Sequence, residues 1–408
     1  MKNEPELRFP EFEDDWEEKI LGELAEIVRG SSPRPISDPR WFDEASDIGW
    51  LRISDVTEQN GKIYNLEQRI SEEGQQKTRV LRSQHLLLSI AASVGKPVMN
   101  YVNTGVHDGF LIFLNPSFKV EFMFYWLDEF KDKWQRYGQP GSQVNLNSSL
   151  VKSQKLYIPR IDEQNKISDF FSKLDRQIEL EEQKLEKLEE QKKGYMQKIF
   201  SQELRFKNEN GNNYPDWEVK KIGEIMDVAS VKRIHQSDWT NEGVKFIRAR
   251  DIVSRYKGKI VEDPLFISKE RYEEYSKLSG KVKIGDLLVT GVGTIGVPLL
   301  INNEKPIYFK DGNIIWLKNE DNIDKNFLFY SFISRKTQNF IKRVAGIGTV
   351  GTYTISNAKK TPILLPVSIE QVKIGNFFNE LDKSIKKQNK KVDLLKERKK
   401  GFLQKMFI

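Results

Sequence analysis

The residues that could carry out chemistry in this sequence are few, and their surroundings disfavour it. Gly291, Gly293 and Gly296 fit the G-x-G-x-x-G pattern of dinucleotide-binding loops. Such a loop must open a helix whose N-terminus holds the pyrophosphate, and Pro298 interrupts a helix at that place. The histidines are too scattered for a histidine-based zinc site; they are His85, His107 and His235.

Two further motifs resemble catalytic elements only in part. Residues 115–118, Asn-Pro-Ser-Phe, differ at the third residue from the Asn-Pro-Pro-Phe/Tyr element of adenine methyltransferases, and no cofactor loop precedes them. Asp216, Glu218 and Lys220 resemble a nuclease carboxylate set, but their spacing is too tight to hold a metal ion. The sequence therefore points to no active site and no bound cofactor, although a stand-alone methyltransferase or nuclease stays open as a hypothesis.

Basic and amide side chains in glycine-rich loops are the stronger chemical signal. Lysine and arginine neutralise phosphates, glycine lets backbone amides approach, and arginine, glutamine and asparagine pair with base edges. These loops favour double-stranded DNA over a reading as solvated loops. The candidate DNA-binding residues are Ser32, Arg34, Arg52, Lys62, Lys96, Arg136, Gln139, Gln143, Asn145, Lys232, Arg233, Arg248, Arg250, Lys342, Arg343 and Thr349.

The composition agrees with an anionic partner and limits the other classes. The 408 residues carry a formal net charge of +7, which is weak support for nucleic acid. Cysteine is absent, so disulfides, thiolate metal sites and cysteine nucleophiles are excluded. No apolar run is long enough to cross a bilayer. We expect a soluble cytoplasmic protein without membrane contact.

The elements that must position these loops are revealed by an internal repeat. Residues 163–200 align with residues 370–407 at a constant offset of 207, with 18 identities in 38 positions. The segments before them repeat only in landmarks, such as Arg52 and Asp55 with Arg248 and Asp251, and Asp108-Gly109 with Asp311-Gly312. The frame is therefore duplicated, whereas the residues between the landmarks differ.

The duplicated segments predict two long helices that pair through a heptad seam. Apolar residues recur with 4-3-4-3 spacing over about five heptads, the pattern of a coiled coil. The seam residues are Phe171, Leu174, Ile178, Leu185 and Leu188 in the first copy and Phe378, Leu381, Ile385, Val392 and Leu395 in the second. If the helices run antiparallel about a pseudo-twofold axis, we expect Glu181 to face Lys399 and Lys192 to face Gln388.

Charge and glycine placement add two expectations about these helices. Residues 173–198 hold seven basic and seven acidic side chains, whereas residues 380–405 hold ten basic and four acidic, so the pair repels less than two basic helices would. Gly194 and Gly401 each cost about 1 kcal/mol inside a helix. Their matched positions suggest that another backbone, such as that of a partner subunit, approaches there. Ser368 with Gln371 predicts a capping box, and Asp162 predicts an N-cap.

We therefore predict a mixed α/β fold of two globular domains separated by two long helices. The first domain covers residues 1–160 and the second residues 204–367. The first long helix covers residues 161–203 and the second residues 368–408. The alternative arrangement, in which each helix packs only on its own domain, fits less well because a narrow 38-residue seam needs a long partner.

This layout resembles the specificity subunit of type I restriction-modification enzymes over essentially the whole chain. The resemblance rests on the repeated Glu-Gln, Phe-Phe, Leu-Asp and Gln-Lys-x-Phe elements of the helices. It also rests on the openings Trp16-Glu17 to Gly22-Glu23 and Trp217-Glu218 to Gly223-Glu224, on residues 49–55, and on the helix entries at residues 159–167 and 366–374. The second domain departs at Ala249, and Thr349-Val350-Gly351 differs from Ser142-Gln143-Val144, which leaves the base-contacting residues in doubt.

The resemblance implies a non-catalytic subunit with two target recognition domains, each reading one half of a split DNA site. It implies that the helices set the spacing and bind two modification subunits that use S-adenosylmethionine, and that restriction subunits using ATP and Mg²⁺ join them. Because the two domains differ, we expect an asymmetric site. The alternative is a coiled-coil protein-interaction scaffold without sequence-specific DNA contact, whose DNA binding would survive scrambling of the base sequence.

Overall fold

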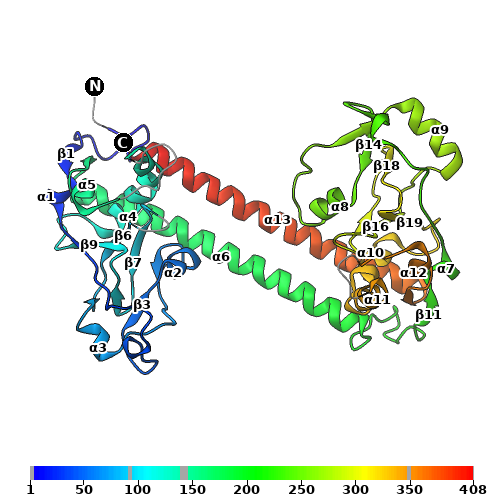
Figure 1. Ribbon diagram of the computed structural model, residues 1–408, viewed down its shortest axis with the longest axis horizontal. Helices are drawn as coiled ribbons and strands as arrows, with labels where there is room; N and C mark the ends of the chain where they lie inside the picture. Colours follow the sequence, from blue (N-terminus) through cyan, green and yellow to red (C-terminus); the bar gives the residue numbers. More distant parts are fainter. Residues whose placement is uncertain (1–3, 91–93, 138–145, 347–350, 408) are drawn as a thin grey trace. The chain divides into compact units, whose positions relative to one another are not determined.

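The computed structural model describes residues 4–90, 94–137, 146–346 and 351–407. The chain forms two compact units, residues 1–182 with 390–408 and residues 183–389, which we call the first and second unit. Each unit holds one globular domain and one half of each long helix, α6 (Ile161–Phe200) and α13 (Ser368–Met406) (Figure 1). Among the helices that the structure describes, none has the length and apolarity needed to cross a membrane.

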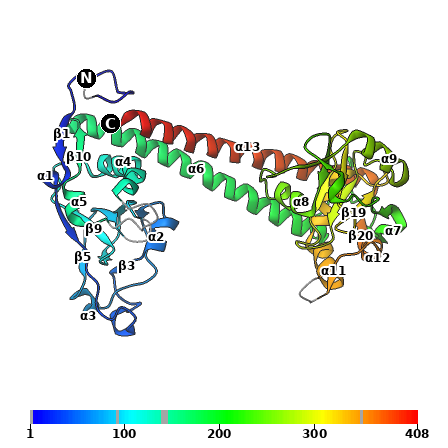
Figure 2. The ribbon, with the colours of Figure 1, turned by 45° about the horizontal axis from the view of Figure 1, so that its top comes forward.

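The first domain is built from three sheets. A five-stranded sheet has the order β2-β9-β6-β7-β4, a three-stranded sheet the order β3-β8-β5, and β1 pairs with β10. In both views the three-stranded sheet lies at the end of the domain away from α6 (Figures 1 and 2). The strands are β1 (Glu17–Ile20), β2 (Glu26–Arg29), β3 (Gly49–Leu51), β4 (Lys62–Ile63), β5 (Arg79–Leu81), β6 (Leu86–Ser89), β7 (Pro97–Asn100), β8 (Thr104–Val106), β9 (Phe110–Leu114) and β10 (Lys155–Ile158).

The second domain repeats this architecture with different residues. The order β12-β19-β16-β17 matches β2-β9-β6-β7, and β14 pairs in parallel with β18 as β3 does with β8. β13 and β15 complete the sheet of β14 and β18, and β11 pairs with β20. The strands are β11 (Glu218–Lys221), β12 (Asp227–Ala229), β13 (Trp239–Thr240), β14 (Val244–Ile247), β15 (Leu265–Ile267), β16 (Leu287–Thr290), β17 (Pro298–Leu300), β18 (Ile307–Phe309), β19 (Ile314–Lys318) and β20 (Pro362–Leu365).

Short helices connect and cover these sheets. In the first domain they are α1 (Leu21–Leu24), η1 (Pro39–Trp41), α2 (Ile53–Glu58), α3 (Glu72–Gln75), α4 (Val120–Phe130), η2 (Lys131–Tyr137) and α5 (Ser148–Lys152). In the second they are α7 (Ile222–Ile225), η3 (Gln236–Asp238), α8 (Ala249–Tyr256), α9 (Lys269–Ser279), α10 (Lys325–Ile333), α11 (Arg335–Ala345) and α12 (Ile355–Lys359). The aromatic side chains of α4 are core: Phe122, Phe124, Tyr125 and Trp126 are all buried. The fold class predicted from the sequence is confirmed.

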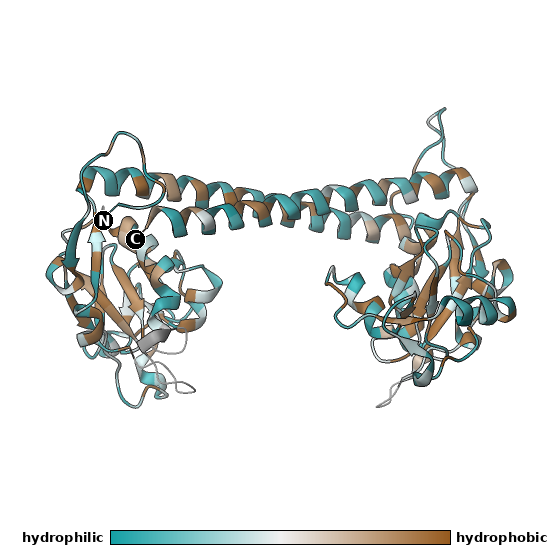
Figure 3. Ribbon diagram, turned by 90° about the horizontal axis from the view of Figure 1, so that it is seen from above, coloured by the Kyte–Doolittle hydropathy of each residue, from teal (hydrophilic) through white to brown (hydrophobic). Residues whose placement is uncertain are grey.

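Both long helices contribute to the hydrophobic core of each unit. In the first unit the core of the domain includes Ile167 and Phe171 from the start of α6, Leu403 and Met406 from the end of α13, and Phe407, which follows α13. In the second unit it includes Ile374 and Phe378 from the start of α13, and Ile199 and Phe200 from the end of α6. Hydrophobic strands lie inside each domain, whereas the helices alternate hydrophobic and hydrophilic residues (Figure 3).

Within each unit the two helices contact each other in an antiparallel sense. Phe170 of α6 contacts Phe402 of α13 in the first unit, with ring centroids 5.1 Å apart, and Tyr195 contacts Phe377 in the second, also at 5.1 Å. These two contacts are related by the offset of 207, because Phe377 repeats Phe170 and Phe402 repeats Tyr195. The helices therefore pack on each other as well as on their own domains.

The predicted register of this pairing is wrong. Lys399 Nζ lies 2.6 Å from Asp175 Oδ1 instead of facing Glu181, and Lys192 Nζ lies 2.6 Å from Asp382 Oδ1 instead of facing Gln388. The prediction matched polar seam residues with one another. In the observed pairing each lysine instead contacts an aspartate beside the seam, so that both lysines have a partner of opposite charge.

Both predicted N-terminal caps of the long helices are also wrong. α13 already begins at Ser368 and α6 at Ile161, so neither Ser368 nor Asp162 stands before its helix. The Gln371 side-chain oxygen is not available for a capping box, because it accepts from the backbone N–H of Asp324 at 3.0 Å, while its Nε2 donates to Pro366 O just before the helix. The side chain is used to bind the domain to the helix.

Candidate DNA interface

Each domain is fixed to its long helix by a buried glutamate, a glutamine and an arginine. In the first unit Arg8 donates to both carboxylate oxygens of Glu163 at 2.8 Å, and Gln164 accepts from Lys119 N, the residue before α4. In the second unit Arg205 pairs with Glu370, and Gln371 binds Asp324, the residue before α10. This repeated joint sets how each domain is presented on its helix.

A second repeated joint has an aspartate at its centre. Asp175 Oδ2 accepts from Lys62 Nζ at 2.6 Å and from Tyr125 Oη at 2.8 Å, while Oδ1 pairs with Lys399. Burial alone would raise the pKa of Asp175, but the charges and hydrogen bonds of Lys399 and Lys62 lower it overall. In the second unit Asp382 binds Lys192 and Tyr330. Lys62, a DNA-binding candidate, is therefore engaged with α6 and has an exposed side-chain fraction of only 20%.

Ser32 and Arg34 lie together on the loop after β2, around Asp108. Ser32 Oγ donates to Asp108 Oδ1 at 2.9 Å, Arg34 pairs with Oδ2 at 2.7 Å, and Arg29 donates to the Asp108 carbonyl. Partial burial would raise the pKa of Asp108, but the Ser32 hydrogen bond and the charges of Arg34 and Arg29 lower it overall. The Arg34 side chain stays 77% exposed, so one carboxylate orients a cation that still faces solvent.

Arg52 and Arg248 occupy equivalent places at the starts of α2 and α8. Arg52 donates to both oxygens of Asp55, and Arg248 does the same with Asp251 while also donating to Asp263 O. The aspartates are buried and accept the backbone N–H of the same arginines. This arrangement fixes the guanidinium groups with their charge largely neutralised. Arg250, in contrast, is 59% exposed and only 3.6 Å from Asp251 at its nearest nitrogen.

The other first-domain candidates are only partly described. Lys96 is half-buried beside Lys131, and burial, followed by the charge of Lys131, lowers its pKa. Arg136 lies in η2, and its side chain is outside the described part of the structure. Gln139, Gln143 and Asn145 lie outside the described residues.

The second-domain candidates form two exposed groups. Lys232 and Arg233 follow β12, and Lys232 Nζ lies 4.1 Å from the centre of the Tyr275 ring. Lys342 and Arg343 form the last turn of α11, with the Arg343 guanidinium over Phe340. Arg233 and Lys342 make no side-chain hydrogen bond or ion pair to another described residue. Thr349 lies outside the described residues.

The structure adds residues that the candidate set omits. Asp108 and Arg29 complete the cluster around Arg34, and the signal for Asp108 was its repetition as Asp311. Asp175 and Tyr125 hold Lys62, and the signal for Asp175 was its identity with Asp382. In both cases an aspartate at a repeat landmark positions a cation, a pairing that the sequence alone does not specify.

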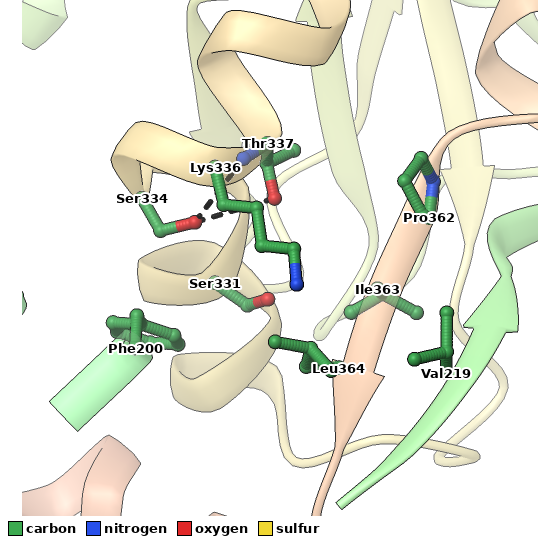
Figure 4. A pocket seen from close by; sticks show the side chains of 9 residues that line it. All are labelled: Phe200, Val219, Ser331, Ser334, Lys336, Thr337, Pro362, Ile363 and Leu364. Carbon is green, nitrogen blue, oxygen red and sulfur yellow. Dashed lines mark hydrogen bonds between the residues drawn. The ribbon is translucent and has the colours of Figure 1, made fainter. Parts of the chain in front are cut away.

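One pocket among the described residues is too small for a cofactor. A pocket in the second unit lies between α10, α11 and the β11–β20 pair, with Lys336 reaching across it and Ser334 bonded to Thr337 (Figure 4). It leaves only about 20 Å³ for the centres of water-sized molecules, enough for a water or two. The loop with Gly291, Gly293 and Gly296 leads into strand β17 and not into a helix, so it lacks the geometry of a dinucleotide site.

The fold and the repeated joints define a two-domain protein of one known class. The family model described as "Type I restriction modification DNA specificity domain" matches residues 13–190 and again residues 214–396. The chain therefore belongs to this family and carries two copies of its domain.

Individual relatives agree with this assignment. The type I restriction enzyme MjaVIII specificity subunit of Methanocaldococcus jannaschii is 24% identical over 421 residues, which cover 97% of this chain and 92% of the relative. The putative type I restriction enzyme specificity subunit S.HindORF215P of Haemophilus influenzae is 29% identical over 169 residues, 40% of this chain and 41% of its own.

Solved structures share the fold at low sequence identity. The type I restriction-modification S subunit from M. genitalium matches with a TM-score of 0.59 and 14% identity, over 99% of both chains. A chain from work on complex assembly and conformational transition of the type I R-M system matches with a TM-score of 0.59 and 16% identity, over 96% of this chain and 97% of its own.

Proposed function

We propose that this chain is the DNA-specificity subunit of a type I restriction-modification complex. In this proposal each domain reads one half of an asymmetric, bipartite DNA site, and α6 with α13 sets the spacing between the halves. Two modification subunits that use S-adenosylmethionine dock on the helices, and restriction subunits that use ATP and Mg²⁺ join them. The chain itself supplies recognition and no catalysis.

The repetition of the joints, set against the divergence of the loops, carries this proposal. Glu163 and Glu370 each bind an arginine, Gln164 and Gln371 each accept from a backbone N–H before a helix, and Asp175 and Asp382 each bind a tyrosine and a lysine, so both domains are attached to the helices in a similar way. The exposed loops share no such pattern: Arg34 is held by Asp108, whereas Asp311 is paired with Lys310. Two domains that are attached to the helices in a similar way but expose different side chains support recognition of two different base sequences.

The exposed cations support DNA contact more than the neutralised ones do. Arg34, Arg233, Arg250, Lys342 and Arg343 leave their charge available to phosphates or base edges. Arg52, Arg248 and Lys62 are paired with the largely buried carboxylates of Asp55, Asp251 and Asp175, whereas Asp108, which pairs with Arg34, is 37% exposed. Breaking a pair with a buried carboxylate is costly. We propose the first set as contacts and the second as residues that position the surface.

Methylation sequencing of a host with and without the chain tests the function directly. The expected result is the loss of one split, asymmetric methylated motif on deletion. Footprinting of the complex should show two protected patches with an unprotected spacer, and scrambling either half-site should abolish binding. One continuous patch, or binding indifferent to sequence, would favour the protein-interaction scaffold.

The spacing role has its own experiment. Seven residues inserted after Glu182 in α6 and after Asn389 in α13 keep the heptad seam and lengthen each helix by about 10 Å. The preferred spacer of the DNA site should become longer. An unchanged spacer would contradict the spacing role and leave the reading role intact.

A further inference from the structure

Exposed apolar side chains gather in the second unit on the β11–β20 pair and at the start of α13. They are Val219 on β11, Val367 just before α13, and Ile369 and Val372 near its start, with exposed fractions of 68%, 39%, 65% and 44%. Leu364 lies directly opposite Val219 in the strand pair and is half-buried (Figure 4). We call these five residues the β11 patch. Apolar side chains that gather on a surface mark an interaction site, whereas singly scattered ones do not.

The matching positions of the first unit are all polar or charged. By the registers of the two strand pairs and the offset of 207, they are Glu18, Tyr157, Arg160, Asp162 and Asn165. There Glu18 pairs with Lys155 at 2.7 Å and accepts from Tyr157 Oη at 3.3 Å, and Arg160 pairs with Asp14 at 3.0 Å. The same local fold carries ion pairs in one unit and apolar side chains in the other. The fold itself therefore does not require the β11 patch.

The open edge of β11 offers backbone hydrogen bonds beside this patch. Among the described strands, β11 pairs with β20 alone. The Ile222 N–H donates to Thr361 O at 3.0 Å. Because hydrogen-bonded and non-hydrogen-bonded pairs alternate along an antiparallel ladder, Val219 turns its N–H and C=O away from β20. Such an edge is a template for a further strand.

We infer that the β11 patch binds the same patch of a second copy of this chain, with the two β11 strands antiparallel about a twofold axis at Val219. In this register Val219 of one copy lies opposite Val219 of the other, and Glu218 of each copy lies opposite Lys220 of the other. The two copies exchange two backbone hydrogen bonds, bring opposite charges together and cover each other's apolar side chains. A twofold interface uses the same surface on both partners, and this surface is complementary to itself.

Other occupants suit the β11 patch less well. In the proposed function the modification subunits bind twice, whereas the patch is present in one unit only. DNA gains nothing from exposed apolar side chains, and on β11 the charge of Lys220 is already balanced by Glu218 at 3.0 Å. A second copy of the chain matches the patch in both hydrophobicity and charge.

Analytical ultracentrifugation of the full chain over a range of concentrations tests the inference. The unchanged chain should form dimers. Val219→Glu with Ile369→Asp introduces the residues that the first unit has at these positions, so the variant should fold, as circular dichroism would show. Its dimer should dissociate at a concentration about tenfold higher or more.

Ile260→Asp is the matched control for the loss of an exposed apolar side chain. Ile260 is 89% exposed in the second unit but lies outside the β11 patch. This variant should dimerise as the unchanged chain does. A chain that stays monomeric at every concentration, or a dimer that is equally stable in the Val219→Glu, Ile369→Asp variant, would overturn the inference.

A cross-link tests the register by itself. The chain has no cysteine, so Val219→Cys introduces a single thiol. Directly opposite residues of a hydrogen-bonded antiparallel pair have Cα atoms about 5.5 Å apart, which a disulfide can span. Oxidation with copper phenanthroline should give a covalent dimer of Val219→Cys and none of Ile260→Cys. Equal cross-linking of the two variants, or cross-linking of neither, would contradict the pairing. Both experiments omit DNA and other subunits, so their outcome is independent of the proposed function.

Discussion

Loss of the negative charge of Asp175 should lower the free energy of unfolding of the first unit strongly, although the shape of the side chain hardly changes. The Asp175 carboxylate accepts from Lys62 and Tyr125 through one oxygen and pairs with Lys399 through the other, at 2.6, 2.8 and 2.6 Å. Its side chain is 19% exposed. Asp175→Asn removes the charge, keeps the volume, and leaves two lysines beside each other without an anion.

The magnitude follows from these contacts. A hydrogen bond to a charged group contributes about 1.5–3 kcal/mol, and breaking a buried pair costs about 3–5 kcal/mol. Because the site is partly open to water, we take the lower end and expect Asp175→Asn to lower the free energy of unfolding by about 3 kcal/mol. Asp382 has one lysine and one tyrosine and is 36% exposed, so Asp382→Asn should cost only about 1 kcal/mol once screening is included.

Urea unfolding, followed by tryptophan fluorescence at several pH values, measures both effects. The folded pKa of Asp175 lies below its unfolded value, so its contribution is present above about pH 4 and is lost as the pH falls through the folded pKa. The difference between the two proteins should be constant from pH 7 to about 5 and shrink below about 4. Arg176→Ala removes an exposed pair with Glu179 on the same helix and is the control, at no more than about 0.5 kcal/mol. A cost for Asp175→Asn as small as the control's, or one that persists unchanged at low pH, would refute the reasoning.

Three further results are expected. Trp217→Phe should lower the free energy of unfolding by about 1–2 kcal/mol, because Trp217 Nε1 donates to the fully buried Glu370. Trp16→Phe should lower it less, because Trp16 Nε1 has no partner among the described residues. Chemical denaturation of both variants measures the difference. Phe171→Ala should cost about 3–5 kcal/mol by opening a cavity where α6 meets the first domain, as differential scanning calorimetry would show. Arg233→Ala and Lys342→Ala should each reduce the slope of log affinity for DNA against log salt by about one, whereas a slope unchanged in both would remove these residues from the interface.

The periodic parts of the fold could be predicted from the sequence because their signal is local and repeated. The 4-3-4-3 spacing around Phe171, Ile178 and Val392 marks a helix face at any register, and the offset of 207 shows that the two helices are equivalent. The register itself could not be predicted in this way. Seam residues such as Ile178 fit several pairings, and the observed one depends on Asp175 and Asp382, which stand beside the seam and also bind tyrosines of the domains.

The candidate site was less predictable for a related reason. The sequence shows that an arginine lies in a loop, but it does not show whether a carboxylate neutralises the guanidinium or whether the side chain stays exposed to solvent. Arg52 and Arg34 are both paired with aspartate, yet Arg52 caps α2 beside a buried Asp55, whereas Arg34 remains 77% exposed over Asp108. The difference arises from contacts between residues 74 positions apart in the chain, which spacing does not encode.

The division between shared and divergent residues also constrains how the two recognition surfaces can change. A substitution in the joint formed by Arg205, Glu370 and Gln371 affects the second domain in two ways. It disturbs packing, because Glu370 is fully buried, and it disturbs the attachment of the domain to α13, because Gln371 binds the residue before α10. A substitution at Arg233 or Lys342 disturbs no described hydrogen bond or ion pair. New specificity can therefore arise at low structural cost in the exposed loops, whereas any change in the joints must be matched by its partners on the helix.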